Sequence, residues 1–173
     1  MNKISEPFKD LTSLNGIEYI SGDATDPIDT LGQDRLICHI SNNRGGWGRG
    51  FVSALSRKWS KPESDYRSYG NYCLGDIIIS EVGPGLSVIS MIAQNGYRSP
   101  SNPVAVDYDA LRTCLEKVSA IALSGGFERL SSSVHMPRIG CGLGGGDWDV
   151  ISDIIDDELI FYDVPVFVYD LTN

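Results

Sequence analysis

The chain lacks the features that mark several large protein classes. Its 173 residues contain no apolar run of about 18 residues, so we expect no membrane-spanning helix. The four cysteines are widely spaced and form no C-x-x-C pair, so the sequence predicts no zinc or other metal site. The motif G-x-x-x-x-G-K-[ST] is also absent, which excludes a P-loop nucleotide-binding protein.

Positive charge is scarce as well. Lys and Arg number 14 against 23 Asp and Glu, which gives a formal net charge of −9. Nucleic-acid-binding surfaces use Lys and Arg to neutralise phosphates, so this balance disfavours a nucleic-acid partner. A small anion remains compatible, because backbone N–H groups bind phosphate without cationic side chains. No secretory signal is recognisable, and we expect a cytoplasmic monomer with neither a membrane nor a sequence-specific nucleic-acid partner.

Hydrophobic patterning predicts strands that alternate with helices. The expected strands cover residues 16–22, 35–41, 76–83, 86–94, 133–139 and 164–171. The expected helices cover residues 50–59, 107–126 and 148–159. Gly83-Pro84-Gly85 predicts a hairpin turn between two of the strands. The alternation predicts an α/β fold with helices on both faces of a mixed, mostly parallel sheet.

The domain organisation that follows is simple. No repeat, low-complexity segment or change of composition divides the chain. Its length fits one domain, which we place at residues 16–173. A polar N-terminal segment at residues 1–15 precedes it.

Two glycine-rich stretches stand where a predicted strand passes into a predicted helix. The first is NNRGGWGRG at residues 42–50, and the second is GCGLGGG at residues 140–146. Such a junction directs N–H groups at the helix N-terminus, where the helix dipole favours anions. Glycine lets a phosphate approach the backbone without a Cβ in the way. Two such loops in one small domain predict a ligand with two phosphates.

Other interpretations of the glycines stay open. They can serve only to make tight turns and close helix packing. Residues 140–145 also match G-x-G-x-x-G, the dinucleotide fingerprint. That fingerprint belongs to the first strand–helix unit, with an acid about 20 residues further on, and neither condition is clearly met here. A dinucleotide oxidoreductase is therefore the weaker hypothesis.

Four stretches together resemble a known family. They are GDAT (22–25), HISNNRGGWGRGF (39–51), MPRIGCGLGGGDW (136–148) and VYDL (168–171). They resemble the macrodomains, which bind ADP-ribose, and are most similar to bacterial and phage relatives of the terminal ADP-ribose protein glycohydrolase. The resemblance covers about residues 16–171. It implies a single three-layer α/β/α domain that needs no cofactor.

The resemblance also implies ligand-binding positions. Asp23 would accept from the adenine amino group, with the N–H of Ala24 nearby. Tyr169 and Leu171 would pack near the adenine. Ser41, Asn42 and Asn43 would face the distal ribose. The first loop would line the diphosphate and distal ribose with Gly46, Gly48, Gly50 and Phe51. The second loop would bind phosphate through Gly140, Cys141, Gly142, Leu143, Gly144 and Gly145.

Catalysis is where the chain departs from the pattern. The vertebrate glycohydrolase of this branch uses a lysine–aspartate pair, and the matching positions here carry Gln94 and Gly144. Gln94 cannot form a Schiff base with the sugar. The catalytic candidates are Asn43, Gln94 and Asp147. Gln94 could equally cap its strand end, and Asp147 could simply cap the helix that begins at residue 148.

Local roles compete with ligand contact elsewhere. Asp23 can bond to Thr25 in a turn. Cys141, like His39 and His135, can be a packing residue of the core. Trp47 can cover the ligand as a lid.

The predicted function is hydrolysis of mono-ADP-ribose from acidic side chains of proteins. Two alternatives use the same cavity. One is a small-molecule enzyme acting on ADP-ribose-1″-phosphate or O-acyl-ADP-ribose, and the other is a non-catalytic ADP-ribose reader. Loss of the lysine–aspartate pair supports the reader.

Overall fold

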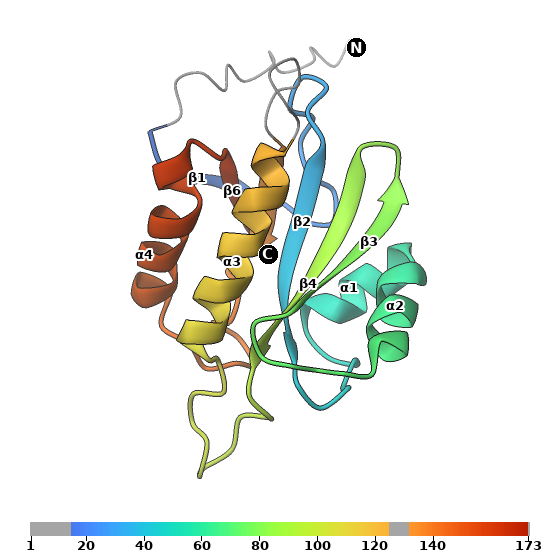
Figure 1. Cartoon of the computed structure of the whole chain (residues 1–173), viewed down its shortest axis with the longest axis vertical. Coiled ribbons are helices and arrows are strands. Elements are labelled where there is room, and N and C mark those ends of the chain that lie inside the picture. The colour runs from blue at the N-terminus through green and yellow to red at the C-terminus, as the bar shows by residue number, and fades with distance from the viewer. Residues whose placement is uncertain (1–14, 125–131, 173) are drawn as a thin grey trace.

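The computed structural model describes residues 15–124 and 132–172. Figure 1 shows a central sheet with helices on both sides. The elements are β1 (Glu18–Ser21), β2 (Arg35–Asn42), α1 (Phe51–Lys58), α2 (Lys61–Tyr69), β3 (Ile77–Gly83), β4 (Leu86–Gln94), α3 (Tyr108–Leu123), β5 (Ser133–Pro137), α4 (Trp148–Glu158), the 3₁₀ helix η2 (Ile160–Tyr162) and β6 (Val166–Asp170). The predicted N-terminal segment, apart from Asn15, lies outside the described residues, as do residues 125 and 126 at the end of the predicted helix 107–126.

The sheet has the order β1-β6-β5-β2-β4-β3. Every neighbouring pair is parallel except β3 and β4, which form the antiparallel hairpin around Gly83-Pro84-Gly85. The predicted mixed, mostly parallel α/β sheet is thereby confirmed. Among the described residues, no helix is both long and apolar enough to cross a membrane.

Alternate residues of β2 point to opposite faces and meet two separate layers of helices. Cys38 packs with Leu111 and Ile155, which come from α3 and α4. Its neighbour Ile37 packs with Leu55 and Tyr66, which come from α1 and α2. The chain therefore has the three α/β/α layers that the resemblance implies.

The helix α2 was not predicted. Its sequence, KPESDYRSY, is mostly polar, and only Pro62 and Tyr66 are buried. Its one large apolar anchor, Tyr66, packs against Trp47 and Tyr72 with tilted rings, and the ring centroids lie 5.3 and 4.9 Å away. A local pattern of hydrophobicity cannot reveal a helix that depends on partners elsewhere in the chain.

The sheet topology brings the two glycine loops together. One loop follows β2 and leads into α1, and the other follows β5 and leads into α4. Because β2 and β5 are adjacent and parallel, their carboxyl ends meet at the same edge of the sheet. Ligands of open α/β sheets bind at that edge.

Candidate functional site

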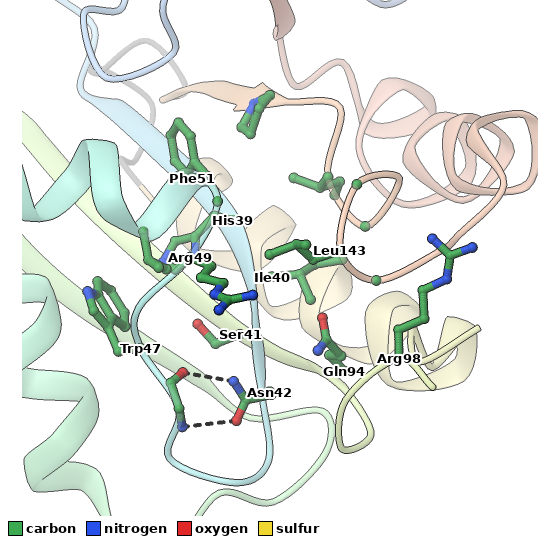
Figure 2. A pocket seen from close by; sticks show the side chains of 18 of the residues that line it. His39, Ile40, Ser41, Asn42, Trp47, Arg49, Phe51, Gln94, Arg98 and Leu143 are labelled. Atoms are coloured by element: carbon green, nitrogen blue, oxygen red, sulfur yellow. Dashed lines mark hydrogen bonds between the residues drawn. The ribbon is translucent and has the colours of Figure 1, made fainter. Parts of the chain in front are cut away.

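A cavity of about 940 Å³ opens at this edge of the sheet. Figure 2 shows it between the end of β2, the first glycine loop, the end of β4 and the second glycine loop. The lining residues are His39, Ile40, Ser41, Asn42, Gly46, Trp47, Gly48, Arg49, Gly50, Phe51, Val52, Gln94, Tyr97, Arg98, Pro137, Arg138, Ile139, Gly140, Gly142, Leu143 and Gly144. A diphosphate-containing ligand fits a cavity of this volume.

Asn42 fixes the start of the first loop. Its Nδ2 donates to the carbonyl of Gly46 at 2.8 Å, and its Oδ1 accepts from the N–H groups of Arg44 and Gly46 at 2.8 and 3.1 Å. The hydroxyl of Tyr66 donates to the carbonyl of Asn42 at 2.7 Å. The Asn42 side chain, predicted to face a ribose, is thus bonded to its own loop.

The N-terminus of α1 faces the cavity without a side-chain cap. Gly50 is its N-cap residue at φ 76°, a left-handed conformation that favours glycine. Residues 48–52 all line the cavity. In the described part of the chain, the N–H groups of residues 47–52 have no hydrogen-bond acceptor, whereas the next one, that of Ser53, donates to the carbonyl of Gly50 at 3.1 Å. These N–H groups and the helix dipole together favour an anion.

The second loop is closed by its own backbone. The N–H of Gly146 donates to the carbonyl of Gly140 at 2.8 Å, and that of Gly145 donates to Gly142 at 3.2 Å. Within residues 15–124 and 132–172, the N–H groups of residues 142–144 have no hydrogen-bond acceptor. The loop therefore presents a second set of free donors to the cavity.

The charges at the cavity are positive. The lining includes Arg49, Arg98 and Arg138, whereas no Asp or Glu is among the described lining residues of a protein with net charge −9. Figure 2 shows Arg49 and Arg98 on opposite sides of the cavity. Arg138 is bonded to Asp170 through two contacts of 2.6 and 2.8 Å, which raise the pKa of the guanidinium and lower that of the carboxyl.

Two buried polar side chains of β2 line the cavity with an atom unpaired. His39 Nε2 bonds to the hydroxyl of Ser90 at 2.8 Å. Among the described residues, His39 Nδ1 and Ser41 Oγ have no hydrogen-bond partner. Burial lowers the pKa of His39 to about 4, so the ring is neutral at neutral pH.

Gln94 and Gly144, the positions matched to the lysine–aspartate pair, are neighbours. The Gln94 amide donates from Nε2 to the carbonyl of Gly96 at 3.0 Å. Its Oε1 lies 3.4 Å from the position that a Cβ would take at Gly144. Both residues line the cavity, so Gln94 is the one of the three catalytic candidates that the structure places there.

The other two catalytic candidates make local contacts outside the lining. Asn43 accepts from the N–H of Gly96 at 2.8 Å and donates to Asn95 at 3.2 Å. Asp147 is exposed and accepts from the N–H of Asp149 at 2.9 Å as the N-cap residue of α4. The capping interpretation of Asp147 is confirmed.

The residues predicted to hold adenine lie at the carboxyl ends of β1 and β6, beside the cavity. Asp23 is exposed and accepts from the N–H and hydroxyl of Thr25 at 2.8 and 2.9 Å. Ala24 and Tyr169 are buried in one cluster, and Phe51 packs against it while also lining the cavity. Leu171 is 77% exposed. Their contact with adenine stays a prediction.

Three other residues of the two loops make contacts within the protein itself. Cys141 packs against the core under α3 and α4, which supports its role as a packing residue. A Cβ at Gly145 would stand 2.5 Å from the carbonyl of Pro103, and Gly145 is not among the described residues that line the cavity. Trp47 is buried and donates from Nε1 to Ser56 at 2.8 Å, so it forms a wall of the cavity and is no lid.

The predictions from the sequence left out several contributors to the site, among them Arg49 and helix α2. The exposed Arg49 lies between Gly48 and Gly50, and the prediction for this part of the loop named only its glycines. The helix α2 braces the first loop, and its start carries a signal that could have been used. That signal is S-x-x-E at residues 60–63 with Pro62 in the first turn.

Comparison with solved structures identifies the class of protein. A macrodomain protein from Streptomyces coelicolor is 38% identical, with 89% of this chain and 98% of that one covered and a TM-score of 0.75. A protein of unknown function from Bacteroides thetaiotaomicron is 44% identical, with 90% and 98% covered and a TM-score of 0.81. The fold, the cavity and these likenesses define an α/β/α domain with a glycine-lined cavity at the carboxyl edge of its sheet. The chain belongs to the macrodomain family.

Curated relatives are more distant. An ADP-ribose 1″-phosphate phosphatase of Lodderomyces elongisporus is 22% identical over 161 residues, which are 89% of this chain and 99% of the relative. An ADP-ribose glycohydrolase of Bos taurus is 39% identical over 64 residues, 37% of this chain and 40% of the relative. The chain spans only 18% of a third, the chromodomain-helicase-DNA-binding protein 1-like of Mus musculus, at 27% identity. No family model matches the sequence.

Proposed function

We propose that the protein binds ADP-ribose in this cavity and hydrolyses the ester that joins ADP-ribose to an acidic side chain of a protein. The observation that carries the proposal is the pair of adjoining glycine loops, each with N–H groups that lack acceptors among the described residues. Two such arrays suit the two phosphates of one diphosphate. The names of the phosphatase and the glycohydrolase supply the identity of the ligand.

The charge distribution supports an anionic ligand. The cavity gathers three arginines, and its described lining includes no carboxylate, although the chain as a whole is acidic. A diphosphate would be repelled by carboxylates at short range and attracted by arginines. The His39 ring is neutral, so it neither attracts nor repels the charge of the ligand.

The chemistry of the described lining residues supports a linkage to a carboxylate. Among them there is no carboxylic acid and no protonated histidine that could protonate a leaving group. A carboxylate is the leaving group that least needs a proton, because its pKa is only about 4. A water that attacks C1″ of the ribose would displace the carboxylate with its bonding electrons. The water's remaining proton would go to solvent or to a phosphate oxygen.

Gln94 would position that water. Its Nε2 is bonded to Gly96, which fixes the amide plane and leaves Oε1 near Gly144 at the cavity wall. An amide oxygen can accept from a water and orient it without taking the proton. The backbone donors of the two loops would stabilise charge that develops in the transition state.

A second candidate, a non-catalytic reader of ADP-ribose, has one specific observation in its favour. The cavity contains neither a lysine nor a carboxylate among its described lining residues, so general acid–base groups are few. The same donors would then bind ADP-ribose without turning a substrate over.

One experiment separates the candidates. Calorimetric titration with ADP-ribose tests binding, and release of ADP-ribose is followed by mass spectrometry from a protein carrying glutamate-linked ADP-ribose. Serine-linked ADP-ribose and ADP-ribose-1″-phosphate serve as parallel substrates. We expect binding, release from glutamate, and little release from serine. Gln94→Ala should lower release at least tenfold, whereas Glu116→Ala on the exposed side of α3 should not.

Other outcomes have definite meanings. Binding without release from any substrate would replace the hydrolase by the reader. Release of phosphate alone would replace it by the phosphatase. No binding would refute both the hydrolase and the reader.

A further inference from the structure

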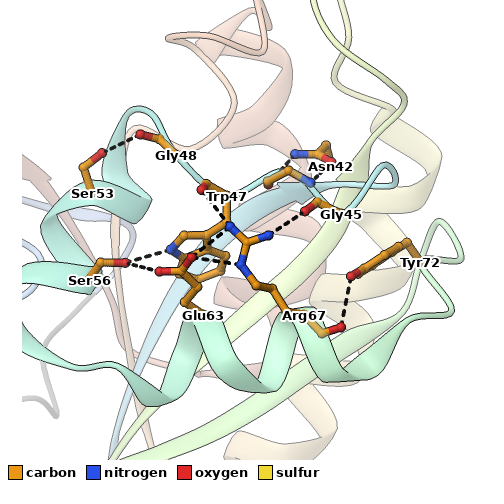
Figure 3. Close-up of polar contacts among 10 residues, drawn as sticks. Asn42, Gly45, Trp47, Gly48, Ser53, Ser56, Glu63, Arg67 and Tyr72 are labelled. Atoms are coloured by element: carbon orange, nitrogen blue, oxygen red, sulfur yellow. Dashed lines mark hydrogen bonds and ion pairs between the residues drawn. The ribbon is translucent and has the colours of Figure 1, made fainter.

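Helix α2 contacts the first glycine loop from outside the cavity. Arg67 donates from Nη1 to the carbonyl of Gly45 at 3.4 Å and from Nη2 to the carbonyl of Trp47 at 3.3 Å. Figure 3 shows its guanidinium lying between these two carbonyls. No residue of α2 is among the described residues that line the cavity. Arg67 thus acts on the loop from the side opposite to the cavity.

The two other carbonyls of this stretch are also engaged by side chains. Asn42 donates to the carbonyl of Gly46 at 2.8 Å, and Ser53 donates to that of Gly48 at 3.1 Å. Each of the four consecutive carbonyls of residues 45–48 therefore accepts from a side-chain donor (Figure 3). A carbonyl oxygen that faced the cavity would repel an anion there.

This arrangement fixes where the loop's N–H groups point. In a trans peptide unit, the C=O and the N–H point in opposite directions. A Trp47 carbonyl held toward α2 directs the N–H of Gly48 away from α2. A Gly48 carbonyl held by Ser53 likewise directs the N–H of Arg49 away from that hydroxyl. Gly48 and Arg49 both line the cavity.

Arg67 is itself held by a ring of contacts. Its Nε donates to Glu63 at 2.9 Å, one turn earlier on α2. The other oxygen of Glu63 accepts from the hydroxyl of Ser56 at 3.1 Å, and Ser56 accepts from the indole N–H of Trp47 at 2.8 Å. The ring closes through the Trp47 carbonyl on Arg67, so it fixes both the side chain and the backbone of Trp47.

We propose that Arg67 is a positioning residue for the diphosphate: it holds the carbonyls of Gly45 and Trp47 outward and thereby presents the loop's N–H groups to the anion. The proposal rests on the proposed function, in which this cavity binds ADP-ribose. Its effect is on affinity through preorganisation, because Arg67 does not itself line the cavity. Loss of Arg67 lets the peptide unit between Trp47 and Gly48 rotate. The carbonyl oxygen of Trp47, which repels an anion, would then face the cavity in place of the N–H of Gly48.

The test compares Arg67→Met with Arg57→Met. Both replace an exposed arginine by an uncharged chain, but Arg57 lies on the last turn of α1 and outside the cavity lining. Calorimetry is run with ADP-ribose, ADP and adenosine, and the melting temperature is measured for each variant. We expect Arg67→Met to weaken ADP-ribose and ADP binding about tenfold, with adenosine binding and melting temperature unchanged. Arg57→Met should bind all three as the wild type does.

Arg67→Lys adds a rescue test. An ammonium is a single point donor that cannot span two carbonyls as the planar guanidinium does, so we expect binding between those of the wild type and Arg67→Met. Unchanged ADP-ribose binding in Arg67→Met would overturn the positioning role. So would an equal loss for adenosine, which indicates general damage, or an equal loss in Arg57→Met, which indicates bulk charge. A wild type that fails to bind ADP-ribose would instead refute the proposed function.

Discussion

The side-chain oxygen of Gln94 lies 3.4 Å from the position that a Cβ would take at Gly144. The two residues come from the end of β4 and from the second glycine loop, 50 positions apart in the chain. They occupy the positions that the resemblance matches to a lysine–aspartate pair. Their proximity supports that match, and both residues line the cavity.

Gly144 cannot accept a side chain without a change in the loop. A Cβ there would stand 2.6 Å from Val106 Cγ2 and 2.8 Å from the carbonyl of Gly140. The second contact is with backbone, which cannot give way as a side chain can. We expect Gly144→Ala to destabilise the protein by about 1–3 kcal/mol and to weaken ADP-ribose binding. Urea unfolding and calorimetry measure the two effects.

Gly142 provides a matched control in the same loop. A Cβ there would meet nothing within 4 Å, so Gly142→Ala should leave the free energy of unfolding nearly unchanged. Equal stabilities of the two alanine variants would contradict the steric argument. The same contacts predict that Gly144→Asp disturbs the loop and does not create a working acid at this position.

The sheet and the long helices could be predicted because their signals are local. The β-branched runs of β3 and β4 and the spacing of Leu111, Leu115 and Val118 on α3 follow directly from the sequence. The helix α2 could not be predicted, because Tyr66 is buried only by aromatic partners from other segments. Tertiary packing there overrides a polar local composition.

The site was predictable where the backbone is the functional group. The two glycine loops can be recognised by their composition and by their place after β2 and β5. The roles of side chains were harder to predict from the sequence, because a polar side chain has several possible hydrogen-bond partners. Asn42 bonds to its own loop and Asn43 bonds to residues 95 and 96, although the resemblance placed both at the ribose. The choice among partners depends on distances that the sequence does not contain.

Asp147 should matter for stability and not for binding. It is the N-cap residue of α4, with Oδ1 accepting from the N–H of Asp149 at 2.9 Å. We expect Asp147→Ala to lower the free energy of unfolding by about 1 kcal/mol, while Asp147→Asn, which keeps a capping oxygen, should stay close to the wild type. Chemical denaturation gives the stabilities, and ADP-ribose release gives the activity. A large loss of release in Asp147→Asn would return Asp147 to the catalytic candidates.

The buried histidines should make the protein acid-sensitive. Burial lowers the pKa of His39 from 6.5 to about 4 and that of His135 to about 3. Below pH 6.5 the unfolded chain takes up protons at these rings while the folded protein does not. The stabilisation is therefore complete above pH 6.5 and declines as the pH falls toward 4 for His39 and toward 3 for His135.

Each ring should contribute a slope of up to about 1.4 kcal/mol per pH unit within its window. The measurement is the free energy of unfolding in urea between pH 7 and 4.5. Its slope against pH should approach the value that corresponds to the uptake of two protons on unfolding. His39→Gln should reduce it by one proton. A pH-independent stability over this range would show that both rings titrate normally in the folded protein.

Ser41 separates a binding role from a structural one, because the two roles predict opposite results. Its buried hydroxyl has no hydrogen-bond partner among the described residues, so it adds nothing to stability that alanine would lose. We expect Ser41→Ala to keep or raise the melting temperature. If the hydroxyl meets a ribose oxygen, as predicted, ADP-ribose binding should weaken by about tenfold. Ser90→Ala, which removes the partner of His39 Nε2, serves as a contrast and should lower the melting temperature. A Ser41→Ala variant that loses stability yet binds ADP-ribose normally would assign the hydroxyl to the fold alone.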